Sequence, residues 1–148
     1  MRWTPHATVA CIIEQDGRFL LVEEMAGGRA VINQPAGHLE EGESFVAAAC
    51  RETLEETGWH VEPEALLGLY TYRAPSNGVT YHRFCFIARP LAPVDGAVLD
   101  DGIIGPLWLT REELEARRND LRSELVTRCI DDYLSGMRYP LEFIQETA

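Results

Sequence analysis

Three glutamates in a short stretch of the sequence have the spacing of one side of a helix. At about 100° per residue, Glu52, Glu55 and Glu56 fall within roughly a 100° arc. Like charges at this spacing repel by roughly 0.2 to 0.5 kcal/mol, and the last two lie near the negative end of the helix dipole. A hard cation such as Mg²⁺ would neutralise them and keep positions free for phosphate oxygens. The alternative is a solvated charged face.

Two neighbouring residues are suited to support such a site. Arg51 is adjacent to Glu52 and can orient a glutamate through a charge-assisted hydrogen bond. Glu43 lies near the start of the same helix and can add a carboxylate oxygen. We therefore expect metal-assisted chemistry on a phosphorylated compound.

The charge balance of the 148 residues limits the classes of binding partner that we expect. Aspartate and glutamate number 24 against 13 basic residues, a formal net charge of −11, which disfavours polymeric DNA or RNA. Every basic residue is arginine, and the absence of lysine excludes Schiff-base chemistry and a P-loop lysine. A small phosphorylated metabolite or nucleotide is the expected partner, and the positive charge must come from a bound cation.

The chain has no apolar run of about 20 residues and begins without the pattern of a secretory signal. We expect a cytoplasmic protein with no membrane role, present as a monomer or homodimer. Its four cysteines are far apart and lack a C-x-x-C pair, so we expect free thiols in apolar surroundings.

The first half of the chain predicts two strands and a helix. Residues 8–13 and 18–24 flank Asp16-Gly17 and are typical of a hairpin. Residues 45–57 are rich in helix-forming residues between an N-cap serine and Gly58, which suits the end of a helix. On this helix we expect an apolar side opposite the glutamates, made by three residues: Ala47, Cys50 and Leu54.

The second half predicts another hairpin, residues 66–73 and 79–88, followed by a long loop over residues 90–105. A short strand at residues 107–109 and a final helix over residues 123–134 complete the pattern. Strands on both sides of one central helix, with helices late, indicate a single α+β domain over residues 1–148.

The acidic stretch resembles the Nudix box, written G-x5-E-x7-R-E-U-x-E-E-x-G-U, where U is a bulky apolar residue. Thr53 departs from the box at an apolar position and can still pack through its methyl group, while Trp59 satisfies the last position. The resemblance implies the Nudix fold, a mixed β-sheet sandwich with a central Nudix-box helix and C-terminal helices. The matching residues are Gly37, Glu43, Arg51, Glu52, Glu55, Glu56 and Gly58.

Roles follow from this resemblance residue by residue. It implies that Glu52, Glu55 and Glu56 bind Mg²⁺, with Mn²⁺ as a substitute, and that Arg51 orients Glu52. Gly37 would offer its carbonyl and Glu43 an auxiliary contact. The base that activates water would be one of the three glutamates or come from a loop before the last strand, where this chain has Asp100 and Asp101.

Three further segments, residues 5–11, 33–40 and 136–142, look like the NudJ-type phosphatases within that family. That subgroup releases inorganic phosphate from nucleoside tri- and diphosphates, thiamine diphosphate and its hydroxymethylpyrimidine diphosphate precursor. Two alternatives are a pyrophosphatase acting on ADP-ribose, nucleotide sugars or modified nucleotides, and a nucleotide-sensing domain without catalysis.

Substrate contacts outside the box are expected from polar residues near it. His38 lies beside the metal loop, and Arg73 and Arg83 lie in or beside the second hairpin, so each is a candidate for binding a phosphate. A stacking surface for a ring, or else core packing, is expected from four aromatic residues: Trp3, Tyr72, Tyr81 and Phe86.

Overall fold

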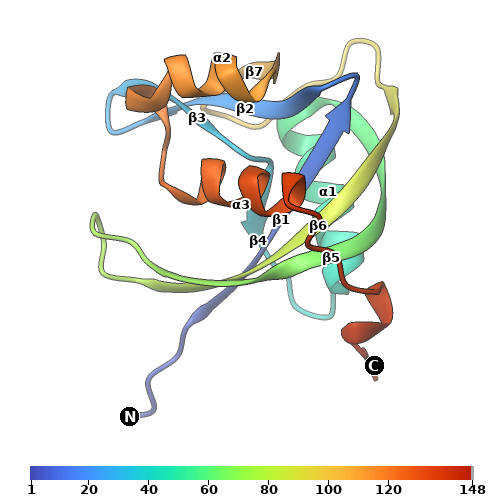
Figure 1. Ribbon diagram of the computed structural model, residues 1–148. Coiled ribbons are helices and arrows are strands. Elements are labelled where there is room, and N and C mark those ends of the chain that lie inside the picture. Colours follow the sequence, from blue (N-terminus) through green and yellow to red (C-terminus); the bar gives the residue numbers. More distant parts are fainter. Residues whose placement is uncertain (148) are drawn as a thin grey trace.

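Strands and helices follow in the order expected for an α+β protein (Figure 1). The computed structural model describes residues 1–147. Its elements are β1 (His6–Gln15), β2 (Arg18–Ala26), β3 (Arg29–Asn33), β4 (Ala36–His38), α1 (Phe45–Thr57), β5 (Trp59–Arg73), β6 (Thr80–Pro93), β7 (Ile103–Leu109), α2 (Arg111–Ala116), η1 (Arg118–Asp120), α3 (Leu125–Leu134) and η2 (Leu141–Phe143).

The strands form a mixed sheet in which β1 is central. β1 pairs in parallel with β6 over eight residue pairs and antiparallel with the short β4. β5 continues this half of the sheet beyond β6, while β2 lies between β3 and β7 in the other half. Six consecutive residues of β1 are buried, which matches a strand covered on both faces.

The predicted first hairpin is formed only next to its turn. β1 and β2 pair at Glu14–Phe19 and Gln15–Arg18, after which each strand joins a different half of the sheet. The left-handed conformations of Asp16 and Gly17 make the tight turn. The sequence predicted the turn correctly, but both strands find their main partners elsewhere.

Helices cover both faces of the sheet, as Figure 1 shows with α1 behind and α3 in front. α1 packs on one apolar cluster, which includes Val9, Cys11, Leu66 and Phe86. α3 packs on a second, which includes Ala10, Ile12, Leu67 and Ile87. Alternate residues of β1 therefore face different helices, because side chains of a strand alternate between the two faces.

α1 has the predicted bounds. The Ser44 hydroxyl accepts a hydrogen bond from the Ala47 amide at 3.0 Å, and Gly58 ends the helix with a φ of 74°. The predicted apolar side is wrong at Ala47, which is exposed, while Cys50 and Leu54 are partly buried. The buried residues of the helix are Ala48, Ala49, Thr53 and Thr57. The buried side of the helix differs from the predicted one because the side that carries Glu56 also packs inward, against β4.

Thr53 fills its position through hydrogen bonding as well as packing. It is buried, and its hydroxyl donates to the Ala49 carbonyl one turn earlier at 2.8 Å. The departure from the box is thus accommodated without an unpaired hydroxyl.

The predicted loop over residues 90–105 is too long. β6 continues to Pro93 and β7 begins at Ile103, so the connection spans residues 94–102. Pro90 and Pro93 had suggested a loop, but the pairing of β6 with β1 ends at Ala88, so β6 beyond this point has an open edge that tolerates proline. Bulges in the β5–β6 pair absorb the remaining irregularity.

The C-terminal segment packs on the sheet and on α1. Tyr139 and Leu66 exchange two backbone hydrogen bonds of 2.8 Å, and the Glu146 carboxylate accepts the Phe45 amide at 3.1 Å. A carboxylate at the N-terminus of α1 complements the helix dipole. This packing adds to the Ser44 cap in fixing where α1 begins.

The cysteines are free thiols, as expected: Cys11, Cys85 and Cys129 are buried, and Cys50 is partly buried. None of the helices found within residues 1–147 has the length and apolar character needed to span a membrane.

The N-cap of α1 gives a prediction about stability. Ser44→Ala removes the hydroxyl that pairs with the Ala47 amide, so it should lower the free energy of unfolding by about 1 kcal/mol. Ser44→Asn keeps an N-cap oxygen and should stay within about 0.5 kcal/mol of wild type. Denaturant unfolding measures both; equal values for the two variants would contradict the capping role.

Candidate metal and substrate site

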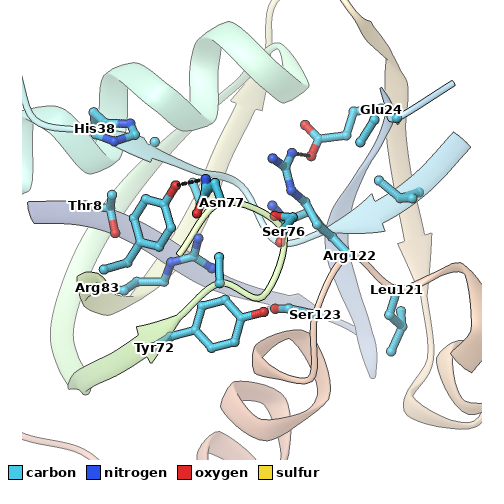
Figure 2. Close-up of a pocket in the computed structure, with 18 of the residues that line it drawn as sticks. Thr8, Glu24, His38, Tyr72, Ser76, Asn77, Arg83, Leu121, Arg122 and Ser123 are labelled. Carbon is cyan, nitrogen blue, oxygen red and sulfur yellow. Dashed lines mark hydrogen bonds and ion pairs between the residues drawn. The ribbon is translucent and has the colours of Figure 1, made fainter. Parts of the chain in front are cut away.

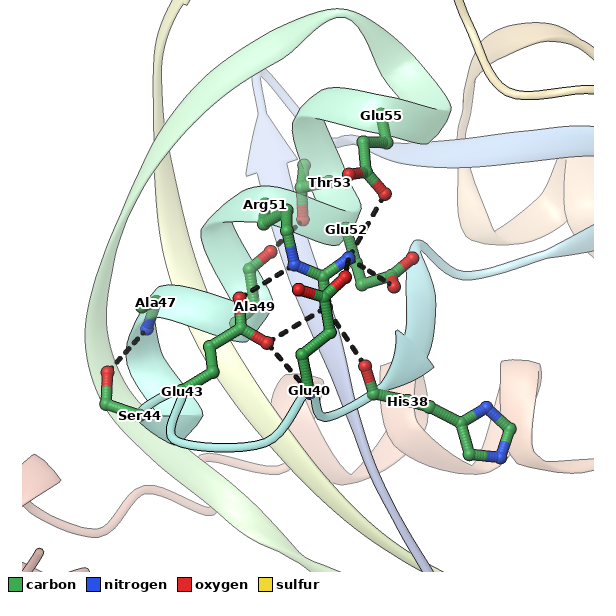
Figure 3. Close-up of polar contacts among 10 residues, drawn as sticks. All are labelled: His38, Glu40, Glu43, Ser44, Ala47, Ala49, Arg51, Glu52, Thr53 and Glu55. Atoms are coloured by element: carbon green, nitrogen blue, oxygen red, sulfur yellow. Dashed lines mark hydrogen bonds and ion pairs between the residues drawn. The ribbon is translucent and has the colours of Figure 1, made fainter.

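Arg51 is the centre of a network of carboxylates on α1 (Figure 3). Its guanidinium donates to both oxygens of Glu43, at 2.7 and 2.9 Å. Nη1 also donates to Glu52 at 2.8 Å and to Glu55 at 3.1 Å, while Nη2 reaches the His38 carbonyl at 3.0 Å. Glu40 forms a longer ion pair with the same guanidinium, at 3.5 Å, so one cation holds four carboxylates and the end of β4.

These bonds explain the charge states around Arg51. Its hydrogen bond lowers the pKa of Glu43, and the same bond raises the pKa of Arg51 itself. Glu43 is engaged at both oxygens and helps to fix the guanidinium. Arg51 is therefore oriented by Glu43 on one side and by the glutamates of α1 on the other.

Glu52 lies in direct contact with the backbone of Gly37. A Cβ atom at position 37 would lie 2.1 Å from the carboxyl carbon of Glu52, so any larger residue would displace this carboxylate. The close approach, rather than an unusual φ, requires glycine here. Burial raises the pKa of Glu52, and the hydrogen bond from Arg51 acts in the opposite direction.

Glu56 is the carboxylate most strongly affected by burial. The Ala36 amide donates to it at 2.8 Å, which ties α1 to β4. Desolvation raises the pKa of Glu56 to about 8, and the negative charges of Glu52, Glu24 and Asp100 contribute in the same direction. None of the arginines within residues 1–147 forms an ion pair with Glu56.

The donor set fits a hard divalent cation. Carboxylate and carbonyl oxygens are the ligands that Mg²⁺ prefers. A cation would offset both the desolvation and the repulsion between carboxylates, which together raise the pKa of Glu56. In the described chain, no three side chains among His, Cys, Asp and Glu already lie close enough to share one ion. Glu52 and Glu55 point to Arg51 instead, so their carboxylates would turn toward a bound ion.

A cavity of about 560 Å³ opens beside Glu56 (Figure 2). β4, β1 and β6 form one wall, and β2, β3, the β5–β6 turn and the segment before α3 form the rest. Its volume is within the range of small-molecule sites. The lining residues are Thr8, Glu24, Ala26, Gly27, Arg29, Val31, Asn33, Ala36, Gly37, His38, Glu56, Tyr72, Ala74, Ser76, Asn77, Tyr81, Arg83, Leu121, Arg122 and Ser123.

The structure brings two of the three predicted phosphate contacts to this cavity. His38 and Arg83 line it, whereas Arg73 is exposed and does not belong to the lining. The ring of His38 lies 3.1 Å from His6, nitrogen to nitrogen. Desolvation, followed by His6 and Arg83, lowers the pKa of His38 and so favours its neutral ring.

The two aspartates before β7 differ in their surroundings. The Asp100 amide donates to the Glu55 carbonyl at 3.1 Å, and its charge contributes to the raised pKa of both Glu52 and Glu56. Both side chains are exposed, but Asp101, on the adjacent turn, is not among the charges that raise these pKa values. Of the pair, Asp100 is thus the residue that the fold brings to the glutamates.

The candidate aromatic residues separate into two groups. Tyr72 and Tyr81 line the cavity, where their rings are available to a ligand. Phe86 is fully buried in the cluster beneath α1, and Trp3 is exposed with an edge contact to His82.

Several residues of the lining were not predicted from the sequence. Thr8, Asn33, Glu24 and Arg122 come from separate segments, and the last two form an ion pair across the cavity (Figure 2). A polar side chain inside an apolar strand, such as Thr8 or Glu24, was the available signal. It does not show which strands lie beside it.

Comparison with known proteins agrees with this geometry. A family model described as the NUDIX domain matches residues 4–129. Phosphatase NudJ of Escherichia coli strain K12 is 41% identical over 140 residues, which make up 95% of this chain and 90% of that protein. A NUDIX hydrolase from Nitrosomonas europaea has a TM-score of 0.94 at 46% identity, covering 97% of each chain.

An ADP-ribose pyrophosphatase from Streptococcus suis matches with a TM-score of 0.68 at 14% identity, covering 92% of this chain and 96% of the other. It shares the fold alone. The expected α+β Nudix fold, with its mixed sheet, is confirmed by these neighbours. Two residues of the box, Gly37 and Glu56, line the cavity, and the chain belongs to the Nudix hydrolase family, whose NudJ-type phosphatases it resembles.

Proposed function

We propose that this Nudix hydrolase is a Mg²⁺-dependent phosphatase that releases inorganic phosphate from small organic di- and triphosphates. The observation that carries the proposal is the partly buried carboxylate of Glu56, which lines the cavity, is repelled by Glu52 and forms no ion pair with an arginine within residues 1–147. The candidate substrates are nucleoside tri- and diphosphates, thiamine diphosphate and hydroxymethylpyrimidine diphosphate. Similarity to phosphatase NudJ supports this choice over other diphosphates.

Glu52, Glu55 and Glu56 would hold the metal, together with the carbonyl of Gly37. When bound, the cation supplies charge neutralisation at phosphate oxygens and an activated water. Arg51 keeps Glu52 and Glu55 on the same side of α1, and Glu43 acts on the site through Arg51. Gly37 leaves the space into which the Glu52 carboxylate fits.

The reaction is attack of water on phosphorus, with departure of the bridging oxygen on the organic product. One proton must leave the attacking water, and the carboxylates of α1 and Asp100 are the nearby groups that can accept it. Tyr72 and Tyr81 offer ring faces to the organic half of the substrate.

Product analysis tests this proposal directly. Purified protein with Mg²⁺ is incubated with thiamine diphosphate, its pyrimidine diphosphate precursor, nucleoside di- and triphosphates and ADP-ribose. Phosphate, pyrophosphate and nucleoside monophosphate are then measured separately, with and without a chelator. We expect phosphate from the first three groups, lost on chelation and restored by Mg²⁺ or Mn²⁺.

Two other results would indicate a different function. Monophosphates from ADP-ribose alone would identify a pyrophosphatase. Nucleotide binding without any product over hours would identify a sensing domain.

Glu56→Gln gives a prediction about activity. It keeps the size of the side chain but removes its charge, so kcat should fall about 100-fold or more. Glu142→Gln, an exposed residue far along the chain, makes the same charge change and should retain wild-type kcat. Phosphate release measures both, with circular dichroism to show that the fold persists; undiminished turnover in Glu56→Gln would refute the proposed site.

The raised pKa of Glu56 predicts how stability depends on pH in metal-depleted protein. Between pH 4.5 and about 8, this carboxyl keeps a proton in the folded state that the unfolded chain has released. The contribution of Glu56 to stability therefore falls as pH rises through this window and is constant above it.

Glu56→Gln removes this dependence. Its free energy of unfolding should rise relative to wild type as pH increases from about 5 to about 8, whereas that of Glu142→Gln should not. Denaturant unfolding at several pH values, with chelator present, gives the comparison. A difference between Glu56→Gln and wild type that is independent of pH would contradict the raised pKa.

A further inference from the structure

Two buried polar atoms lack a hydrogen-bond partner within the described chain: the Thr8 hydroxyl oxygen and Nε of Arg83. Thr8 is only 2% exposed. A buried polar group without a partner costs about 1–3 kcal/mol, and more when the group is charged. Such groups call for a particular explanation, and an absent ligand is one.

The two residues lie on adjacent strands and line the same cavity. Thr8 and Arg83 are direct partners in the parallel β1–β6 pair, so their side chains project from the same face of the sheet. Both line the cavity beside Glu56. Figure 2 shows the Arg83 guanidinium between Thr8 and Tyr72, pointing into the cavity.

The charge of Arg83 is also uncompensated. No carboxylate within residues 1–147 pairs with it, and its hydrogen bond to the Gln34 side chain is long, at 3.4 Å. Arg89 on the same strand, by contrast, pairs with Glu62 at 2.7 Å and Glu64 at 3.0 Å. Burial lowers the pKa of Arg83, as expected for a cation that lacks a partner.

The order of strands places these groups in a row. β4 carries Ala36, which binds Glu56; β1 carries Thr8, β6 carries Arg83 and β5 carries Tyr72. Neighbouring strands are about 4.8 Å apart. A ligand lying across the sheet thus meets the carboxylates first, then a hydroxyl and a guanidinium, and then an aromatic ring.

We propose that Thr8 and Arg83 form an anion subsite that binds the phosphate group left on the organic product. This deepens, and rests on, the phosphatase function proposed above. The Thr8 hydroxyl and the Arg83 Nε–H donate to oxygens of this phosphate, while the attacked phosphate lies at the glutamates of α1. The organic group then extends toward Tyr72. Substrates need two linked phosphates because one phosphate cannot occupy both places.

The test compares three variants with wild type. Arg83→Gln removes the charge, Thr8→Val replaces the hydroxyl with a methyl group of similar size, and Arg89→Gln is the matched control on the same strand. Binding of AMP and thiamine monophosphate to metal-depleted protein is measured by calorimetry. KM and kcat for phosphate release are measured with Mg²⁺.

Arg83→Gln should weaken monophosphate binding roughly 10- to 100-fold and raise KM more than it lowers kcat, since an ionic hydrogen bond is lost. Thr8→Val should weaken binding several-fold, and Arg89→Gln should match wild type. Without ligand, neither Thr8→Val nor Arg83→Gln should lower the free energy of unfolding, because each removes an unpaired buried group. A purely structural role would lower it.

The outcomes separate the subsite from the enzyme. If wild type releases phosphate but binding and KM in Arg83→Gln stay within threefold of wild type, the subsite is overturned and the phosphatase stands. If wild type hydrolyses none of the substrates, the proposed phosphatase function is wrong. Monophosphate binding to wild type and Arg83→Gln then decides whether the subsite exists. Absence of monophosphate binding to wild type would overturn the subsite as well.

Discussion

Repulsion among partly buried carboxylates is the constraint on which the rest of the site depends. Glu52, Glu55 and Glu56 come from less than two turns of one helix. Within residues 1–147, Arg51 is the only arginine that forms a hydrogen bond or ion pair with any of them. The helix must therefore be held in place by other means. Its caps, its buried small side chains and its contact with β4 supply them, and these hold Glu56 where its pKa rises to about 8.

The order of the strands determines how the polar groups are arranged along the cavity. Because β4, β1, β6 and β5 lie side by side, Glu56 of α1 stands at one end of a cavity that continues past Thr8 and Arg83 to Tyr72. Negative charge at one end and an unpaired cation farther along suit a metal-bound phosphate followed by a second anionic group. A net charge of −11 does not prevent anion binding when the cavity itself contains a buried arginine.

Three polar groups that line this cavity destabilise the folded protein when no ligand is bound. Glu56 is partly desolvated, and within residues 1–147 the Thr8 hydroxyl has no hydrogen-bond partner and Arg83 has no counter-ion. Two apolar clusters, one beneath α1 and one beneath α3, provide the stability that allows these groups to persist. Departures from local rules at functional positions are expected in a fold that is otherwise well packed.

The features that could be predicted from the sequence are local: the bounds of α1, its caps, the common side of its glutamates and the resemblance carried by the box. These depend on residues within a few turns of one another, where helical period and capping act directly. Tertiary structure alone decided that Arg83 and not Arg73 faces the cavity, that Thr8 lies beside it, and that β1 takes β6 as its main partner. The reason is physical: a strand has the same two-residue period whichever strand it pairs with, so the pattern of residues 8–13 could not identify a partner some 70 residues away. The difference between the predicted and the observed buried side of α1 had the same origin, because contact with β4, rather than the helix's own apolar residues, determined which side was buried.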